Sequence, residues 1–270
     1  MREGCPPLAE ALAAYFDDLL IGGKSPATIR TYRSLLKLAD WPTEPVCRAI
    51  IRERVLARSM KTAECVHVAL KGFCAFAVMR GWLVANPMDG IPAPKPKAAP
   101  HRYMTKAQVQ AVYAACDSDQ SRLIVRLLLL GLRANELLAL RWEHVSDTVR
   151  VVYGKGGKHR LLPLDDVTQA MLAATPRVSE YVVPCRYEAL AQRIRRLGAR
   201  AGVPWLRCHD FRRTMASWWA LETQDIATLQ QLGGWASLTM PQHYARSAMQ
   251  MMAVEKARNV GLTARLLGEE

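Results

Sequence analysis

The segment IPAPKPKAAPHRY, residues 91–103, divides the chain into two parts. It contains four prolines, with Lys95, Lys97 and Arg102 among them. Proline lacks an amide proton and fixes the backbone, so a stretch this rich in proline stays stiff and forms no regular hydrogen-bonded structure. The segment therefore predicts a linker between an N-terminal domain, residues 1–90, and a C-terminal domain, residues 104–270.

The part before the linker has the apolar spacing of helices. Residues 8–20 are amphipathic, and residues 60–80 repeat apolar side chains at helical intervals until Gly81. Ser25 followed by Pro26 predicts a helix over residues 26–39, because serine caps helices and proline is favoured at the first helical position. We expect a small helical bundle.

The part after the linker mixes helices with one hairpin. Thr105 predicts the cap of a helix through Tyr113, and the apolar run LIVRLLLL, residues 123–130, predicts a core helix ended by Gly131. Residues 148–153 and 160–164 flank GKGGKH, which predicts a β-hairpin with a basic tip. From residue 187 the pattern is helical again, with breaks at 202–204 and 233–234. The predicted fold class is mostly α, with a mixed α/β C-terminal domain.

The composition points to a polyanionic partner. The chain has 270 residues and a net charge of +13. Residues 1–100 hold 14 basic and 9 acidic side chains, and residues 101–270 hold 23 and 15, so both parts are basic. Nucleic acid is the commonest polyanion for such a chain, although a merely basic surface is the alternative.

Other features narrow the class of protein. The seven cysteines form no CxxC pair, which indicates reduced thiols rather than a disulfide or zinc framework. We find no signal peptide and no uncharged apolar run near the ~20 residues of a membrane helix. Neither a nucleotide-binding loop nor a carboxylate cluster is present. We therefore expect a soluble cytoplasmic protein that needs no cofactor or metal.

One tyrosine is placed to act on a phosphodiester. Tyr244 is the only tyrosine after His209, and it follows Trp235 by nine residues. Cationic side chains stabilise the charge that develops in phosphoryl transfer. An oxygen nucleophile accompanied by two arginines, a lysine and a histidine therefore suggests covalent chemistry on a phosphodiester.

Four segments make the interpretation specific. GLRANELLALRW, GKGGKHRLLPL, HDFRRTMASWW and LGGWASLTMPQHY resemble the catalytic boxes of the tyrosine recombinase (phage integrase) family, in the family's order. SPATIRTYRSLLKL, residues 25–38, resembles the start of the family's core-binding domain. The resemblance covers nearly the whole chain and implies a site-specific DNA recombinase or integrase that works through a covalent 3′-phosphotyrosyl intermediate.

The resemblance assigns roles to residues of the first two boxes. Arg133 matches the first catalytic arginine, and Glu136 matches an acid that orients a cation. Lys155 matches the lysine that protonates the leaving 5′ oxygen, with Lys158 as its rival in the same loop. A flexible ammonium donates a proton more readily than a guanidinium does.

The last two boxes supply the rest of the catalytic set. His209 matches the histidine that assists proton transfer, Arg212 the second arginine clamp, and Tyr244 the nucleophile. His209 and Arg212 are spaced i and i+3, which would place both on one helix face. Trp235 stands where many relatives have histidine, either as an N–H donor or as a packed aromatic residue. Arg213 also stands at a frequent histidine position, and its role is open.

DNA contacts are expected beyond the catalytic set. The candidates are Arg30, Arg33, Lys158, Arg160 and Arg213. Strand exchange implies a homo-tetramer on double-stranded DNA that carries recombination sites, and accessory proteins can take part. After Tyr244 a mostly apolar stripe docks either within its own subunit or on a neighbour: Met249, Met252, Ala253, Lys256, Ala257 and Val260, then Leu262, Leu266 and Leu267.

Two rival functions remain at this stage. A type IB topoisomerase uses a similar tyrosine and cationic pocket but relaxes DNA without exchanging partners. A DNA-binding protein derived from a recombinase would bind without cleaving. The chain's size, its linker and the core-binding-like segment favour a recombinase over the first, and the full catalytic set argues against the second.

Overall fold

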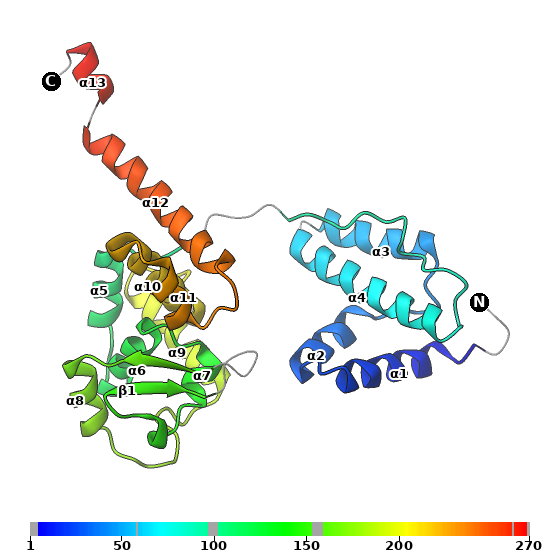
Figure 1. Ribbon diagram of the computed structural model, residues 1–270, viewed down its shortest axis with the longest axis horizontal. Helices are drawn as coiled ribbons and strands as arrows, with labels where there is room; N and C mark the ends of the chain where they lie inside the picture. The colour runs from blue at the N-terminus through cyan, green and yellow to red at the C-terminus, as the bar shows by residue number, and fades with distance from the viewer. Residues whose placement is uncertain (1–4, 58, 97–101, 153–158, 261, 269–270) are drawn as a thin grey trace. The chain divides into compact units, whose positions relative to one another are not determined.

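The chain forms two compact units, Met1–Ala99 and Pro100–Glu270 (Figure 1). The computed structural model describes residues 5–57, 59–96, 102–152, 159–260 and 262–268. Within this part of the chain the fold is mostly helical with one two-stranded sheet, which confirms the predicted fold class. The boundary between the units falls inside the proline-rich segment.

The first unit is a bundle of helices: α1 (Leu8–Ile21), α2 (Pro26–Leu35), α3 (Glu44–Leu56) and α4 (Met60–Met79). The Ser25 hydroxyl caps α2 by accepting the amide of Thr28 at 3.2 Å. The helix ends four residues earlier than the sequence predicts. Leu36 leaves the helical region with ψ of 54° and is buried in the core. Helix α3 is an element that the sequence pattern did not predict.

Helix α4 is the central helix of this core. By length and composition alone it could cross a membrane, but half of its apolar stretch is buried inside the unit. Phe73 packs against Tyr15 and Trp41, with ring centroids 5.6 Å and 5.9 Å apart. The apolar character of α4 is therefore that of a core helix.

The second unit contains the remaining elements, in this order: α5 (Lys106–Ala114), α6 (Asp119–Leu129), α7 (Ala134–Leu138), the 3-10 helix η1 (Trp142–His144), β1 (Thr148–Val151), β2 (Arg160–Pro163), α8 (Asp166–Ala174), α9 (Tyr187–Arg200), α10 (Cys208–Thr223), α11 (Ile226–Gly233), α12 (Thr239–Val260) and α13 (Leu262–Leu267). Thr105 caps α5 with a capping box through Gln108. Buried leucines of α6 and α9 form much of the core.

The predicted hairpin is present. Strands β1 and β2 pair antiparallel, with Val149 opposite Leu162 and Val151 opposite Arg160. Side chains alternate along a strand, so Arg160 and Leu162 share the buried face while Leu161 is exposed. Residues 153–158, which include Lys155 and Lys158, lie outside the described residues.

A glycine turn connects α6 to the start of α7. Gly131 has φ of +96°, a conformation that glycine adopts at little cost. A Cβ there would lie 2.3 Å from the Met215 Cε on α10. The tight turn places Arg133 at the N-cap of α7 and brings the turn close to α10.

Helix α10 packs against α11 and α12. Asp210 starts it by accepting the Arg207 amide at 2.8 Å, and Gln224 ends it in the left-handed conformation. Gly234, also left-handed, ends α11. Helix α12 then packs on α10 and α11, which brings the last predicted box onto the third.

Candidate active site

Glu136 is the acid at the centre of the site. It accepts the Arg133 amide at 2.8 Å and the Arg133 guanidinium at 2.6 Å. Arg160 adds a two-pronged contact at 3.1 Å and 2.6 Å. Burial opposes ionisation of this carboxyl, but hydrogen bonds from Arg160 and Arg133 outweigh it and lower the pKa of Glu136 to about 2.

Arg160, which the sequence predicts to contact DNA, is buried in the structure and not exposed at the surface. Its side chain is 6% exposed, and its guanidinium is turned onto Glu136. The strand alternation explains this placement, because Arg160 shares the inward face of β2 with Leu162. Arg160 therefore braces Glu136 in this structure and presents little surface to a partner. The alternation of buried and exposed positions along the segment RLLPL could have indicated that Arg160 points inward.

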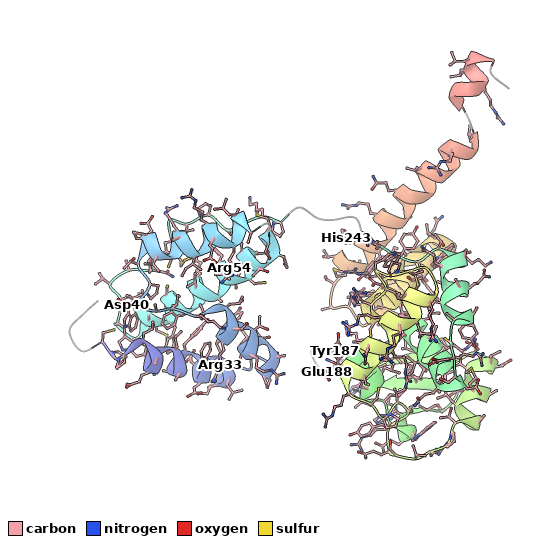
Figure 2. All side chains as sticks on the ribbon, turned by 180° about the vertical axis from the view of Figure 1, so that it is seen from behind. Arg33, Asp40, Arg54, Tyr187, Glu188 and His243 are labelled. Atoms are coloured by element: carbon pink, nitrogen blue, oxygen red, sulfur yellow. The ribbon has the colours of Figure 1, made fainter. Side chains whose placement is uncertain are left out.

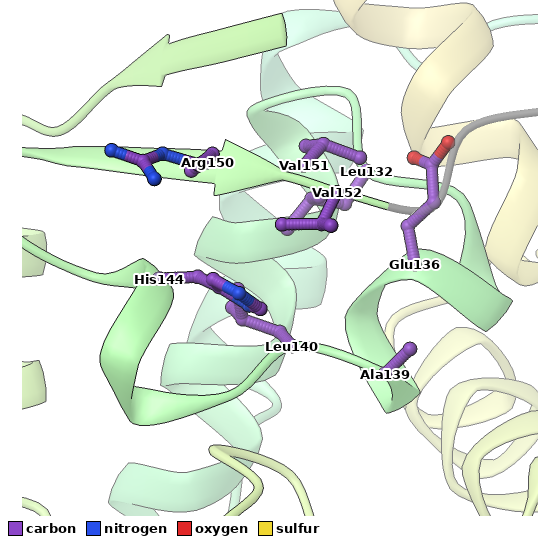
Figure 3. A pocket seen from close by; sticks show the side chains of 8 residues that line it. All are labelled: Leu132, Glu136, Ala139, Leu140, His144, Arg150, Val151 and Val152. Atoms are coloured by element: carbon purple, nitrogen blue, oxygen red, sulfur yellow. The ribbon is translucent and has the colours of Figure 1, made fainter. Parts of the chain in front are cut away.

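A small pocket lies beside Glu136 between α7, η1 and β1 (Figure 3). Its lining is largely aliphatic, with Leu132, Leu140 and Val151 among the residues. Figure 3 shows the Glu136 carboxylate turned away from Leu140 and His144. The pocket is a gap in the packing behind the site and not the place where the predicted catalytic residues meet.

Arg212 is a buried charge that joins three of the boxes. It is 1% exposed and donates to the main-chain carbonyl of Gly131 at 2.5 Å and to that of Gly233. Its guanidinium carbon lies 4.3 Å from the centre of the Trp235 ring, a cation–π contact. Burial, and then the charges of Arg133 and Arg160, lower the pKa of Arg212 to about 9, so it stays charged at neutral pH.

His209 opens toward solvent near the start of α10. Neighbouring groups still shield it from water enough that desolvation lowers its pKa, and the charges of Arg213 and Arg212 lower it further. A histidine with a lowered pKa is neutral at neutral pH. His209 is therefore suited to accept a proton.

Tyr244 lies on α12 and is 1% exposed. It packs with Ala216 and Ala220 of α10 and with Leu229 of α11. Its ring centre is 5.6 Å from that of Trp235. Burial raises the pKa of Tyr244, whereas the charges of Arg212, Arg213 and Arg133 and a hydrogen bond with Arg213 act to lower it.

The structure thus brings together most of the predicted set. The electrostatic neighbours of Tyr244 and Arg212 come from three of the four boxes: Arg133, Glu136, Arg160, Arg212 and Arg213. Lys155 and Lys158 lie outside the described residues. Arg30 and Arg33 belong to the other unit, where both are exposed on α2. Figure 2 labels Arg33. Arg33 stacks over Phe16 at 4.9 Å.

Sequence reasoning missed two anchors of the site. One is Asp210, which pairs with Arg213 at 3.1 Å and is 7% exposed. Their i, i+3 spacing on a helix could have indicated this pair. The other anchor is the set of main-chain carbonyls that hold Arg212, and a carbonyl acceptor leaves no signal in a sequence.

Comparison with known proteins settles the family. Residues 102–251 match the family model described as phage integrase family. The chain belongs to the phage integrase family. This stretch contains all four boxes, and membership makes the chain a tyrosine-type site-specific recombinase, as the sequence indicated.

Similarity to individual proteins extends over nearly the whole chain. The tyrosine recombinase XerC of Haemophilus influenzae is 27% identical, with 90% of this chain and 94% of that protein covered. XerA of Thermococcus kodakarensis is 28% identical, with 96% and 97% covered. A lambda integrase tetramer bound to a Holliday junction has the same fold, with a TM-score of 0.75, 19% identity, and 87% and 79% covered. These matches favour a recombinase over a topoisomerase or a non-catalytic binder.

Replacing Glu136 with glutamine tests the ionised network. The folded-state pKa near 2 lies below the ordinary value of 4.5, so Glu136 stabilises the second unit above pH 4.5 and loses this effect as the pH falls toward 2. We expect Glu136→Gln to lower the free energy of unfolding at pH 7 by roughly 3 kcal/mol. The variant's difference from wild type should shrink below pH 4.

Urea unfolding at pH 7, 5 and 3 measures this effect. Glu143→Gln is the matched control, because that side chain is 66% exposed and its contact with Arg141 is 3.9 Å long. The control should stay within about 0.5 kcal/mol of wild type. Equal losses for the two variants, or a Glu136→Gln loss that does not depend on pH, would contradict the assignment.

Proposed function

We propose that Tyr244 attacks the scissile phosphate of a DNA recombination site. The observation that carries the proposal is that Arg133, Arg212 and Arg213 act electrostatically on a buried tyrosine, while His209 lies among the same arginines. Attack forms a bond between the tyrosine oxygen and phosphorus and breaks the bond to the 5′ oxygen. The products are a 3′-phosphotyrosyl link and a free 5′ hydroxyl.

The arginines stabilise the charge of the pentavalent transition state. Arg133 is 30% exposed and can offer donors to a phosphate oxygen while Glu136 holds its backbone and one nitrogen. Arg212 carries five N–H donors, so two carbonyl contacts leave capacity for a phosphate. The Trp235 indole, beside both Arg212 and Tyr244, is the proposed further N–H donor.

Two groups manage the protons. His209, neutral at neutral pH, takes the proton of the Tyr244 hydroxyl. Lys155 supplies one to the leaving 5′ oxygen, with Lys158 as the alternative. The covalent link keeps the phosphodiester energy, so a 5′ hydroxyl from a second duplex reverses the step without ATP. The scheme requires no metal or cofactor.

Both units contribute to DNA binding in this proposal. The first unit acts as the core-binding domain, and exposed Arg30 and Arg33 on α2 contact the phosphate backbone. The basic charge of both parts of the chain supports contacts of each unit with DNA. The related XerC and XerA proteins are recombinases, which supports a cytoplasmic chain that meets chromosomal, plasmid or phage DNA.

Tyr244→Phe separates cleavage from binding. Removing the hydroxyl removes the nucleophile but keeps the ring that packs on Ala216 and Ala220. We expect no covalent adduct and unchanged DNA affinity within about twofold. The probe is a duplex selected from a random library on the Tyr244→Phe protein and then nicked, so that the cleaved strand dissociates and traps the adduct.

Denaturing gels measure the adduct, and a mobility shift measures binding. Tyr187→Phe is the matched control, because that tyrosine is exposed on α9, and it should trap DNA as wild type does. A covalent adduct with Tyr244→Phe would overturn the nucleophile assignment. Supercoil relaxation without any recombinant product on paired selected sites would favour a topoisomerase.

We also propose that the chain assembles as a tetramer on DNA through its C-terminal tail. Met249, Val254 and Val260 of α12 are 47%, 57% and 46% exposed, and Leu266 of α13 is 77% exposed. The side chains of Met252, Lys256, Ala257 and Leu262 lie outside what the structure describes. Exposed apolar side chains at the end of a chain fit docking on a second copy.

Truncation after Ser247 tests the tail. We expect the shortened chain to bind the selected duplex but to lose the tetramer in light scattering of paired-site complexes, because the apolar contact is missing. Val254→Glu should weaken the tetramer in the same way. Val84→Glu, at a valine of the first unit that is 70% exposed, is the control. Undiminished tetramers of the truncated chain would show that the tail docks within its own subunit.

A further inference from the structure

Arg213 lies on the face of α10 that packs against α12, the helix that contains Tyr244. Residues 213, 216 and 220 fall on one side of a helix, and Ala216 and Ala220 belong to the same buried cluster as Tyr244. The packing of α12 on α10 is the most extensive between helices of this unit. Small side chains at 216 and 220 admit the tyrosine ring, and Arg213 stands one turn before them.

Asp210, one turn before Arg213 on α10, holds the Arg213 side chain. The guanidinium donates to Asp210 Oδ1 at 3.1 Å, and the other oxygen of Asp210 accepts the Arg207 amide at 2.8 Å. Asp210 is 7% exposed and Arg213 is 32% exposed. A carboxylate held by the helix cap thus restricts the arginine to a narrow range of positions.

Arg213 can act only as a hydrogen-bond donor to the nucleophile. Arginine has no acceptor, so in a hydrogen bond with Tyr244 the guanidinium donates and the phenolic oxygen accepts. Such a bond is strongest when the oxygen is negative, and it therefore favours the phenolate over the phenol. Burial of Tyr244 has the opposite effect, because desolvation disfavours the charged form.

Other charged groups face the tyrosine from the elements around it. Arg212 lies beside Arg213 on α10, and Arg133 reaches it from the start of α7. Arg160 and Glu136 adjoin Arg212 from β2 and α7. Helix α11 presents no charged side chain. Arg133 and Arg160 donate to Glu136, and Arg212 donates to two main-chain carbonyls, whereas Arg213 acts on the tyrosine both through its charge and as a hydrogen-bond partner.

We propose that Arg213, held by Asp210, is a catalytic residue that donates to the Tyr244 oxygen and stabilises its phenolate. This inference rests on the proposed function. As the phosphate is attacked, the O–H bond of Tyr244 breaks, its proton passes to His209, and the electron pair stays on the oxygen. Arg213 holds that charge until the bond to phosphorus forms and the 5′ oxygen leaves with the proton from Lys155.

The proposal is tested first on the DNA-free protein. Incorporating 3,5-difluorotyrosine at position 244 lowers the pKa of the phenol toward neutral pH. Its fluorine atoms give a ¹⁹F signal that reports the ionisation. We expect Arg213→Gln to raise the titration midpoint by about one pH unit, the lower end of the effect of a close opposite charge. Arg213→Lys keeps the charge without the planar fork and should give a smaller rise.

Arg196→Gln is the control, since it removes one exposed positive charge from α9. Its midpoint should match that of the fluorinated parent. Circular dichroism checks folding, and Arg213→Lys supplies the comparison if Arg213→Gln does not fold. Unchanged midpoints in both Arg213 variants, or an equal rise with Arg196→Gln, would overturn the proposal.

A second measurement separates this inference from the proposed function. With the nicked selected duplex and the natural tyrosine, the pH profile of adduct formation by Arg213→Gln should move to higher pH by a similar interval. An adduct in wild type with an unshifted profile in the variant would refute the role of Arg213 alone. Absence of any wild-type adduct, together with a shifted ¹⁹F midpoint, would refute the recombinase chemistry while leaving the Arg213–Tyr244 contact in place.

Discussion

The buried guanidinium of Arg212 is the interaction on which the active site depends. A fully buried charge costs several kcal/mol unless it is paired or hydrogen-bonded. Arg212 meets this requirement through the carbonyls of Gly131 and Gly233 and the face of Trp235. These partners belong to the turn before α7 and to the end of α11. One side chain thus joins a segment 81 residues before it to a segment 21 residues after it in the sequence.

The charge balance around Arg212 is incomplete without a ligand. Glu136 pairs with Arg133 and Arg160, and Asp210 pairs with Arg213, whereas Arg212 has only main-chain carbonyls as its described hydrogen-bond acceptors. Burial is the largest cause that lowers the pKa of Arg212 and of neighbouring His209, and the nearby positive charges lower both values further. A phosphate would supply the missing negative charge. The same arginines would therefore stabilise the negative charge that develops in the transition state.

Much of this arrangement could be predicted from the sequence, because local rules governed it. The Ser25 cap, the hairpin around GKGGKH, the break at Gly131 and the order of the boxes were all readable. Helix α3 was missed, and α2 was drawn too long because burial of Leu36 overrode local preference. The partners of Arg212 could not be predicted, since main-chain carbonyls are the same in every residue and only the tertiary fold selects them.

The most direct measurement of the central claim is the chemical identity of the protein–DNA link. Trapped adduct is digested with nuclease and protease, and tandem mass spectrometry locates the remaining nucleotide. The account predicts a 3′-phosphoryl nucleotide on Tyr244 and on no other residue. A nucleotide attached to His243, to Tyr187 or through its 5′ end would contradict it.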